Sequence, residues 1–418
     1  MSSRPGGSIN LQIKLTIRES LSRVAKKHSW ILPIIIFSQF AGTSLWFASN
    51  AVLGDLQRQW GLGDASLSYM TSSVQFGFIV GTLLFAFFTI ADRYSPRKVY
   101  FACSLLGALA NLGLYLLADG LPSLLIFRFI TGFFLAGVYP VGMKIAAGWY
   151  RRGLGLALGW LVGALVVGTA FPHLIKSLNR SLPWETVILS ISIISAVGGC
   201  LMMLLVPDGP YLVKGTKFNR KAFAIIFRSK DLRSASFGYF GHMWELYTVW
   251  AFIPLLIGHY AQTTHQTLNV SWWSFIAIAA GCLGCIAGGF VSKKVGSSTV
   301  AFYQLLSSGV CCLLSPLLFH APPAVFLSFL VFWGIVVVGD SPQFSALTAQ
   351  TAPRDLVGSA LTIVTSIGFF ITIISIQFTN FLVGWINIQI VFLFLVSGPI
   401  IGLFYLWPLF KDRQKKPL

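Results

Sequence analysis

Three ionisable residues stand out in this 418-residue sequence because long apolar stretches surround them. His242 and Glu245 are three residues apart, so they share one face of a helix. Asp340 lies in another apolar stretch. Removal from water favours the neutral form of a carboxylate, and a histidine can share or relay its proton, so this set predicts a proton-coupling site. The alternative is that tryptophan, tyrosine or backbone donors hold each carboxylate and only fix how the helices pack.

A single apolar stretch carries two basic residues, Arg128 and Lys144. If it is helical, Arg128 shares a face with Tyr139, whereas Lys144 is turned away by about 160° unless Pro140 kinks the helix. Cations deep in a membrane are candidates for contact with an anionic or zwitterionic solute. Two alternatives stay open, namely Arg128 as a structural cation and Lys144 reaching out to the aqueous boundary.

Uncharged polar residues add to these candidates. Gln39, Thr43, Trp46 and Asn50 recur at helical spacing and form one stripe on an otherwise apolar stretch. Such a stripe must face protein or water and not lipid, so it predicts either a substrate-lining face or hydrogen bonds between helices. Gln343, in the stretch that holds the second carboxylate, extends the predicted polar lining.

The elements that position these residues are predicted to be membrane-spanning helices. Crossing the hydrocarbon core takes about 20 mostly apolar residues, and a β-barrel would instead show short alternating segments. We therefore expect an all-helical membrane protein with twelve spans. They cover residues 30–52, 67–90, 99–117, 122–149, 154–175, 186–206, 235–257, 271–291, 299–319, 324–350, 356–381 and 388–410.

Composition supports a membrane protein and excludes a soluble one. Only 10% of the residues are charged, against roughly a quarter in an ordinary soluble domain. The formal net charge of +18 does not indicate a nucleic-acid partner, because 25 of the 30 Lys and Arg fall on one side once the spans are placed. That side is predicted to be cytoplasmic. Both termini are then cytoplasmic, in the inner (plasma) membrane, and the first span is retained because it is too long for a signal peptide.

The spans divide into two related halves. The sequence GVYP at Gly137–Pro140 corresponds to GDSP at Gly339–Pro342, and the loop 92–99 to 293–300, at nearly the same shift. We expect two homologous six-helix bundles with a site near the midplane between them. The predicted parts are a basic N-terminus (1–29), a first bundle (30–206), a linker (207–234), a second bundle (235–410) and a tail (411–418).

Two segments carry a resemblance to the major facilitator superfamily. The loop after the second span is similar to that family's G-x-x-x-D-R-x-G-R-K motif, although Phe88 and Ser95 replace its glycines. The fourth span resembles the family's R-x-x-x-G-x-x-x-G segment from Arg128 onward. The fifth span lacks the Gly-Pro pair of drug/proton antiporters, and spans two and eight lack the arginines of nitrate porters. The loop residues that carry the match are Asp92, Arg93, Arg97 and Lys98.

The resemblance implies alternating access between the two halves and a conformational latch at the cytoplasmic end of the second span. Asp92, with Arg93 and Arg97, is expected to pair with a cation such as Arg152 and to lie near the start of span eleven. A charge at a helix end can also be merely solvated.

The sequence therefore predicts a secondary transporter and not an enzyme. We expect it to be a monomer that moves a small anionic or zwitterionic solute by proton-coupled symport, with no cofactor, because it carries no Walker sequence and no metal-ligand spacing. Cys282 and Cys285 have the spacing of a redox or zinc pair but no second pair. The alternatives are an uncoupled facilitator, an efflux transporter, and a sensor or binding protein without transport.

Overall fold

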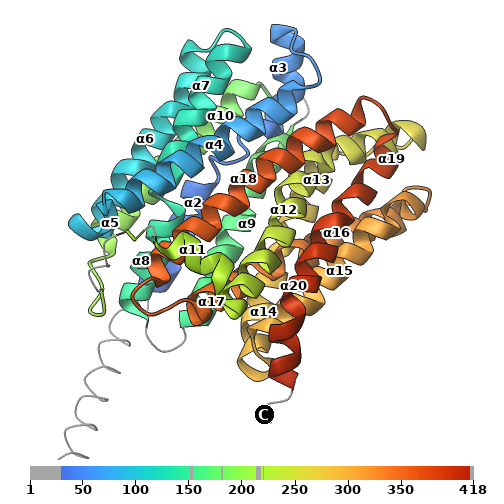
Figure 1. Cartoon of the computed structure of the whole chain (residues 1–418). Helices are drawn as coiled ribbons and strands as arrows, with labels where there is room; N and C mark the ends of the chain where they lie inside the picture. Colours follow the sequence, from blue (N-terminus) through green and yellow to red (C-terminus); the bar gives the residue numbers. More distant parts are fainter. Residues whose placement is uncertain (1–29, 151–153, 180–181, 213–217, 220, 415–418) are drawn as a thin grey trace, which may run out of the picture.

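The computed structural model describes residues 30–150, 154–179, 182–212, 218–219 and 221–414. Within these ranges the chain is almost entirely helical and has no strand. Figure 1 shows the helices of the first part of the chain, blue to green, packed together on one side of the molecule. The later helices, yellow to red, pack on the other side. The predicted all-helical, two-bundle fold is confirmed.

The first bundle is built from the helices before the linker. Its elements are α2 (Ile31–Thr43), η1 (Asn50–Val52), α3 (Leu53–Trp60), α4 (Ser66–Phe87), α5 (Ile90–Arg93), α6 (Pro96–Leu117), α7 (Leu121–Leu135), α8 (Tyr139–Trp149), α9 (Leu154–Leu178) and α10 (Trp184–Leu205).

The second bundle follows α11 (Lys221–Arg228), a short helix of the linker region. Its elements are α12 (Lys230–Thr263), α13 (Val270–Ala279), α14 (Gly281–Val295), α15 (Ser297–Leu318), α16 (Pro323–Gly339), α17 (Ser341–Thr351), α18 (Val357–Val383), α19 (Ile388–Val391), η2 (Phe392–Val396) and α20 (Ser397–Gln414).

Ten helical segments among the described residues are long and apolar enough to cross a membrane. The other two predicted spans differ for physical reasons. The first is interrupted, because α2 ends at Thr43 and helix resumes only at Asn50. The seventh corresponds to α12, which has 34 residues but is less apolar because it carries His242 and Glu245.

The repeated G-x-x-P sequence marks a break in the fourth and tenth spans. Pro140 lies in the first turn of α8, and Pro342 lies in the first turn of α17. A proline lacks the backbone N–H and clashes with the carbonyl four residues earlier, so each span divides into two helices at this position. The break in the tenth span places Asp340 between α16 and α17.

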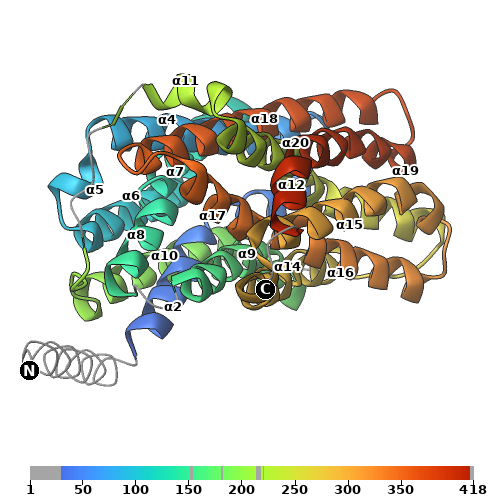
Figure 2. The ribbon, with the colours of Figure 1, turned by 60° about the horizontal axis from the view of Figure 1, so that its bottom comes forward.

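The two bundles meet along two seams of helices. α4 packs against α18, and α9 packs against α13 and α14. Both views show α4 and α18 side by side (Figures 1 and 2). The start of α4 is tied to α18 by hydrogen bonds from Gln377 Nε2 to Ser72 Oγ (2.8 Å) and from Ser68 Oγ to Gln377 Oε1 (3.3 Å). The end of α9 is tied to α13 by Asn269, whose Nδ2 donates to the Ser177 carbonyl (3.1 Å).

Candidate functional site

A buried acid and histidine cluster lies inside the second bundle. His242 and Glu245 are on α12, and Asp340 is at the break between α16 and α17. All three side chains are 0% exposed. His242 Nδ1 lies 2.9 Å from Asp340 Oδ1. The structure thus brings the three predicted residues together, and it encloses them with the helices of their own bundle.

Glu245 is held by a short chain of hydrogen bonds. Trp333 Nε1 donates to Ser308 Oγ (3.2 Å), and Ser308 Oγ donates to Glu245 Oε2 (2.9 Å). Because Ser308 accepts from Trp333, its own proton is directed to the carboxyl group. Cys312 Sγ lies 3.4 Å from the same oxygen. Sequence reasoning missed these three partners, since none of them is ionisable at neutral pH or repeats at a spacing that points to Glu245.

No basic side chain lies within ion-pairing distance of Glu245 among the described residues. The second oxygen, Oε1, is buried without a hydrogen-bond partner there. Transferring a charged carboxyl into such surroundings costs several kcal/mol. A change of Glu245 between its charged and neutral forms must therefore affect how α12 packs against α15 and α16.

The opposite face of α12 contacts the first bundle through aromatic rings. Trp46 is fully buried, and its ring centroid lies 4.9 Å from that of Phe78, 5.7 Å from Tyr247 and 5.5 Å from Phe369. Tyr247 follows Glu245 by two residues, a rotation of about 200° around a helix. One turn of α12 thus presents the acid to its own bundle and an aromatic ring to the other.

Tyrosine hydroxyl groups from both bundles gather beside this aromatic cluster. Tyr139, the first residue of α8, is partly exposed, and its phenol lies near enough to those of Tyr239 and Tyr247 on α12 for electrostatic interaction. Of the predicted substrate contacts, Tyr139 and Lys144 are the two that are partly exposed. Gln343 is buried in α17.

Arg128 supports the break in the first span. Its side chain is 0% exposed, and Nη2 donates to the carbonyl oxygens of Leu45 (3.0 Å) and Trp46 (2.6 Å). Those carbonyls lie just after the end of α2, where the interrupted helix leaves backbone groups without their usual partners. Nη1 lies 3.4 Å from Asn111 Oδ1. Arg128 is therefore a structural cation in this conformation, and no acid pairs with it in the described part of the chain.

The predicted polar stripe does not form one continuous helical face, because the helix ends at Thr43. Thr43 Oγ1 donates to the Gln39 carbonyl (2.7 Å), and Asn50 Nδ2 donates to Thr71 Oγ1 on α4 (2.8 Å). Asn50 thus links two helices. Gln39 is buried against α8, where its Oε1 would lie 2.0 Å from a Cβ added to Gly142.

Asp92 has a described partner that was not predicted for it. Lys144 Nζ pairs with Asp92 Oδ1 and also donates to the Ala91 carbonyl (2.8 Å). In this structure Lys144 therefore holds the loop after α4, and its contact with substrate stays a prediction. Arg152, the expected partner, lies outside the described residues. Arg93 is exposed, and Arg97 Nη1 donates to the Met203 carbonyl (3.4 Å). Neither arginine forms an ion pair with Asp92 in the described part of the chain.

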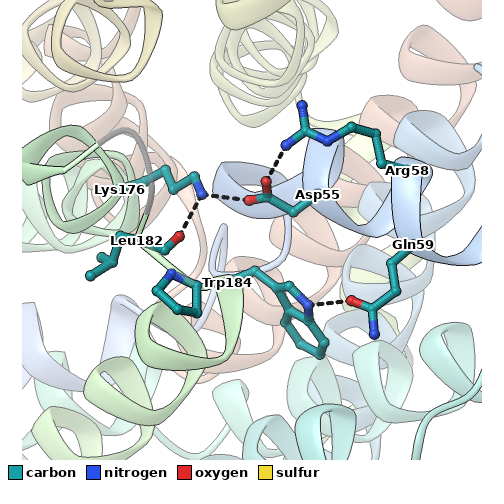
Figure 3. A pocket seen from close by; sticks show the side chains of 7 residues that line it. Asp55, Arg58, Gln59, Lys176, Leu182 and Trp184 are labelled. Carbon is teal, nitrogen blue, oxygen red and sulfur yellow. Dashed lines mark hydrogen bonds and ion pairs between the residues drawn. The ribbon is translucent and has the colours of Figure 1, made fainter.

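A pocket of about 410 Å³ at the opposite end of the first bundle was not predicted (Figure 3). Asp55 of α3 pairs with both Arg58 (2.5 Å) and Lys176 of α9 (2.6 Å). Lys176 also donates to the Leu182 carbonyl (2.9 Å). The charges of Asp55, Arg58 and Lys176 are therefore paired with one another. The ion pair between Asp55 and Lys176 links α3 to α9. From the sequence, Arg58 and Lys176 could only be placed on the side of the membrane opposite the basic loops.

This architecture is that of a multi-pass membrane transporter. The model of the Major Facilitator Superfamily matches residues 35–376. The chain belongs to this superfamily, which confirms the predicted fold class and its assignment to transporters and not to enzymes. None of the curated proteins compared with it by sequence matches the chain.

Solved structures share the fold at low sequence identity. The proton:xylose symporter XylE is 14% identical with a TM-score of 0.70, covering 91% of this chain and 96% of that one. The nucleoside transporter NupG is 15% identical with a TM-score of 0.67, covering 92% and 100%. A bacterial homolog of the human lysosomal transporter Spinster is 15% identical with a TM-score of 0.66, covering 93% and 99%. At such identities the likeness shows the fold alone.

Proposed function

We propose that this protein is a proton-coupled secondary transporter of a small anionic or zwitterionic solute. The observation that carries the proposal is the arrangement on α12, where the buried Glu245 cluster and the aromatic contact with the first bundle lie on opposite faces of one helical turn. A change in the charge of Glu245 must alter the packing behind α12. That change reaches Tyr247, and through it the contact with Trp46.

The His242 and Asp340 pair supplies a second proton site next to Glu245. At a nitrogen-to-oxygen distance of 2.9 Å, the two side chains form an ion pair when the imidazole is protonated. Asp340 lies at the break in the tenth span, between α16 and α17. A change in its charge therefore affects the connection between two helices and not the middle of a continuous helix. We propose that protonation of this cluster and rocking of the two halves occur as one process.

Alternating access requires contacts that break when the bundles rock apart. Gln377, hydrogen bonded to Ser68 and Ser72, and Asn269, hydrogen bonded to Ser177, tie the halves at the ends opposite the basic loops. If the basic side is cytoplasmic, these contacts close the external side. Opening to the outside must then break them.

An anionic or zwitterionic solute is proposed because Arg128 is the one fully buried Lys or Arg among the described residues and has no acidic partner there. Opening of the aromatic cluster at Trp46 would let the acid group of the solute replace the carbonyl oxygens that Arg128 now binds. Comparable transport of neutral analogues that lack the acid group would refute this part. We propose symport in the inner (plasma) membrane, by a monomer with both termini cytoplasmic.

Transport by reconstituted protein tests the proposal. Purified protein in proteoliposomes should accumulate its solute when a pH gradient is imposed. Glu245→Gln should abolish the accumulation, and Asp340→Asn should reduce it. Unchanged accumulation in both variants would refute these two residues as the coupling sites, whereas flux of the native protein without any accumulation would favour uncoupled facilitated diffusion. Saturable binding without any flux would favour a sensor. Lys176→Gln is the matched control, because it removes a partly buried charge that lies in the other bundle.

A further inference from the structure

A lipid-facing groove lies between α12, α15 and α20, with a volume of about 740 Å³. Its walls are apolar, and its outer edge is open to the bilayer because Phe404 and Trp407 of α20 are 75% and 50% exposed. α12 and α20 lie side by side in both views (Figures 1 and 2). The groove belongs to neither the acid cluster nor the aromatic contact between the bundles.

One end of this groove is basic and polar. Lys230, Arg233 and Ser234, all in the first two turns of α12, line it. Lys230 has no hydrogen bond or ion pair to the described residues, and Arg233 has one backbone bond, from Nη1 to the Phe227 carbonyl (3.2 Å). The acids nearest in sequence, Asp231 and Asp412, are exposed and do not line the groove.

The groove also lies at a fixed depth in the membrane. Lys230 is the first residue of α12, and Trp407 lies four residues before Lys411 near the end of α20. Tryptophan close to the end of a span is typical of the membrane interface. The cationic end is therefore at headgroup level, and the aromatic and aliphatic walls are at the level of the acyl chains.

We propose that this groove binds an anionic phospholipid of the leaflet on the basic side. Two cations and a hydroxyl suit a phosphate-bearing headgroup, and the apolar walls formed by residues such as Phe302 and Leu403 suit an acyl chain. A free phosphate would leave the apolar walls unused. A zwitterionic lipid would not match the excess of positive charge. The ligand is thus a whole anionic lipid.

Lipid titration of the purified full-length chain in detergent tests this site, with bound lipid counted by native mass spectrometry. Dioleoyl phosphatidylglycerol should bind with one tight site, and dioleoyl phosphatidylcholine should not. A cation at a membrane surface contributes about a fivefold change in affinity. The double variant Lys230→Gln/Arg233→Gln should therefore bind the anionic lipid about 30-fold more weakly.

Matched variants separate this groove from general attraction to basic protein. Lys293→Gln/Lys294→Gln removes the same charge at the end of α14, outside the groove, and should leave the tight site intact. Phe404→Ala, on the exposed wall, should weaken lipid binding without unfolding the protein. Equal loss in both double variants, equal binding of phosphatidylcholine, or full competition by inorganic phosphate would each overturn the proposal. None of these readouts depends on transport.

Discussion

Replacing Glu245 by glutamine separates proton coupling from structure. Glutamine has nearly the shape of glutamate, and its amide oxygen can accept the Ser308 bond that spans 2.9 Å in the native protein. It cannot bind or release a proton at neutral pH. If Glu245 carries the coupling proton, Glu245→Gln should still move solute down its own gradient but lose accumulation against it.

The expected changes in stability distinguish a loss of proton coupling from a loss of structure. Exchanging a charged for a neutral hydrogen-bond acceptor costs about 1–1.5 kcal/mol, which a folded bundle tolerates. Glu245→Ala removes the bond altogether and adds a cavity, so its cost is about 3 kcal/mol or more. We therefore expect the melting temperature of Glu245→Gln to stay close to that of the native protein and that of Glu245→Ala to fall.

The assay compares the accumulation ratio with the exchange rate in proteoliposomes. A gradient of one pH unit is worth about 1.4 kcal/mol per proton, so one-to-one symport gives about tenfold accumulation in the native protein. Glu245→Gln should give a ratio close to one while retaining exchange of labelled solute. A ratio near ten in Glu245→Gln would refute the assignment of the coupling proton to this residue.

Three further results are expected. Asp340→Asn should reduce the accumulation ratio. His242→Gln should change the dependence of that ratio on pH, because the 2.9 Å pair between the imidazole and Asp340 is lost. An unchanged ratio and an unchanged pH dependence would count against a role for the His242–Asp340 pair. Arg128→Leu should lower the melting temperature in detergent, since it removes two charge-assisted bonds worth about 1.5–3 kcal/mol each, whereas a solvent-facing cation would leave it unchanged. Cross-linking Ser68→Cys to Gln377→Cys with a short thiol reagent should stop transport, and continued flux would contradict closure at that contact, with the single-cysteine variants as controls.

The features that follow from local composition could be predicted from the sequence. Apolar length identified the helical membrane protein and nearly all of its spans, because burying backbone groups in lipid leaves few other solutions. The rarity of charge within those spans singled out His242, Glu245 and Asp340. The structure places all three in one buried cluster.

What the sequence could not predict depends on the path of the chain in space. The break after Thr43 has no proline or glycine at the break itself, and it is stabilised by Arg128 from a distant helix. The pairing of Lys144 with Asp92 likewise depends on how α8 lies against the loop after α4. Ser308 and Trp333 gain their role only by proximity to Glu245.

The most direct test of the account is a flux screen of metabolite pools in proteoliposomes with and without an imposed pH gradient. The account predicts at least one acidic or zwitterionic solute that accumulates only with the gradient and whose entry is accompanied by measurable proton uptake. Flux of the same solute at equal extent with and without the gradient, and without proton movement, would contradict proton coupling.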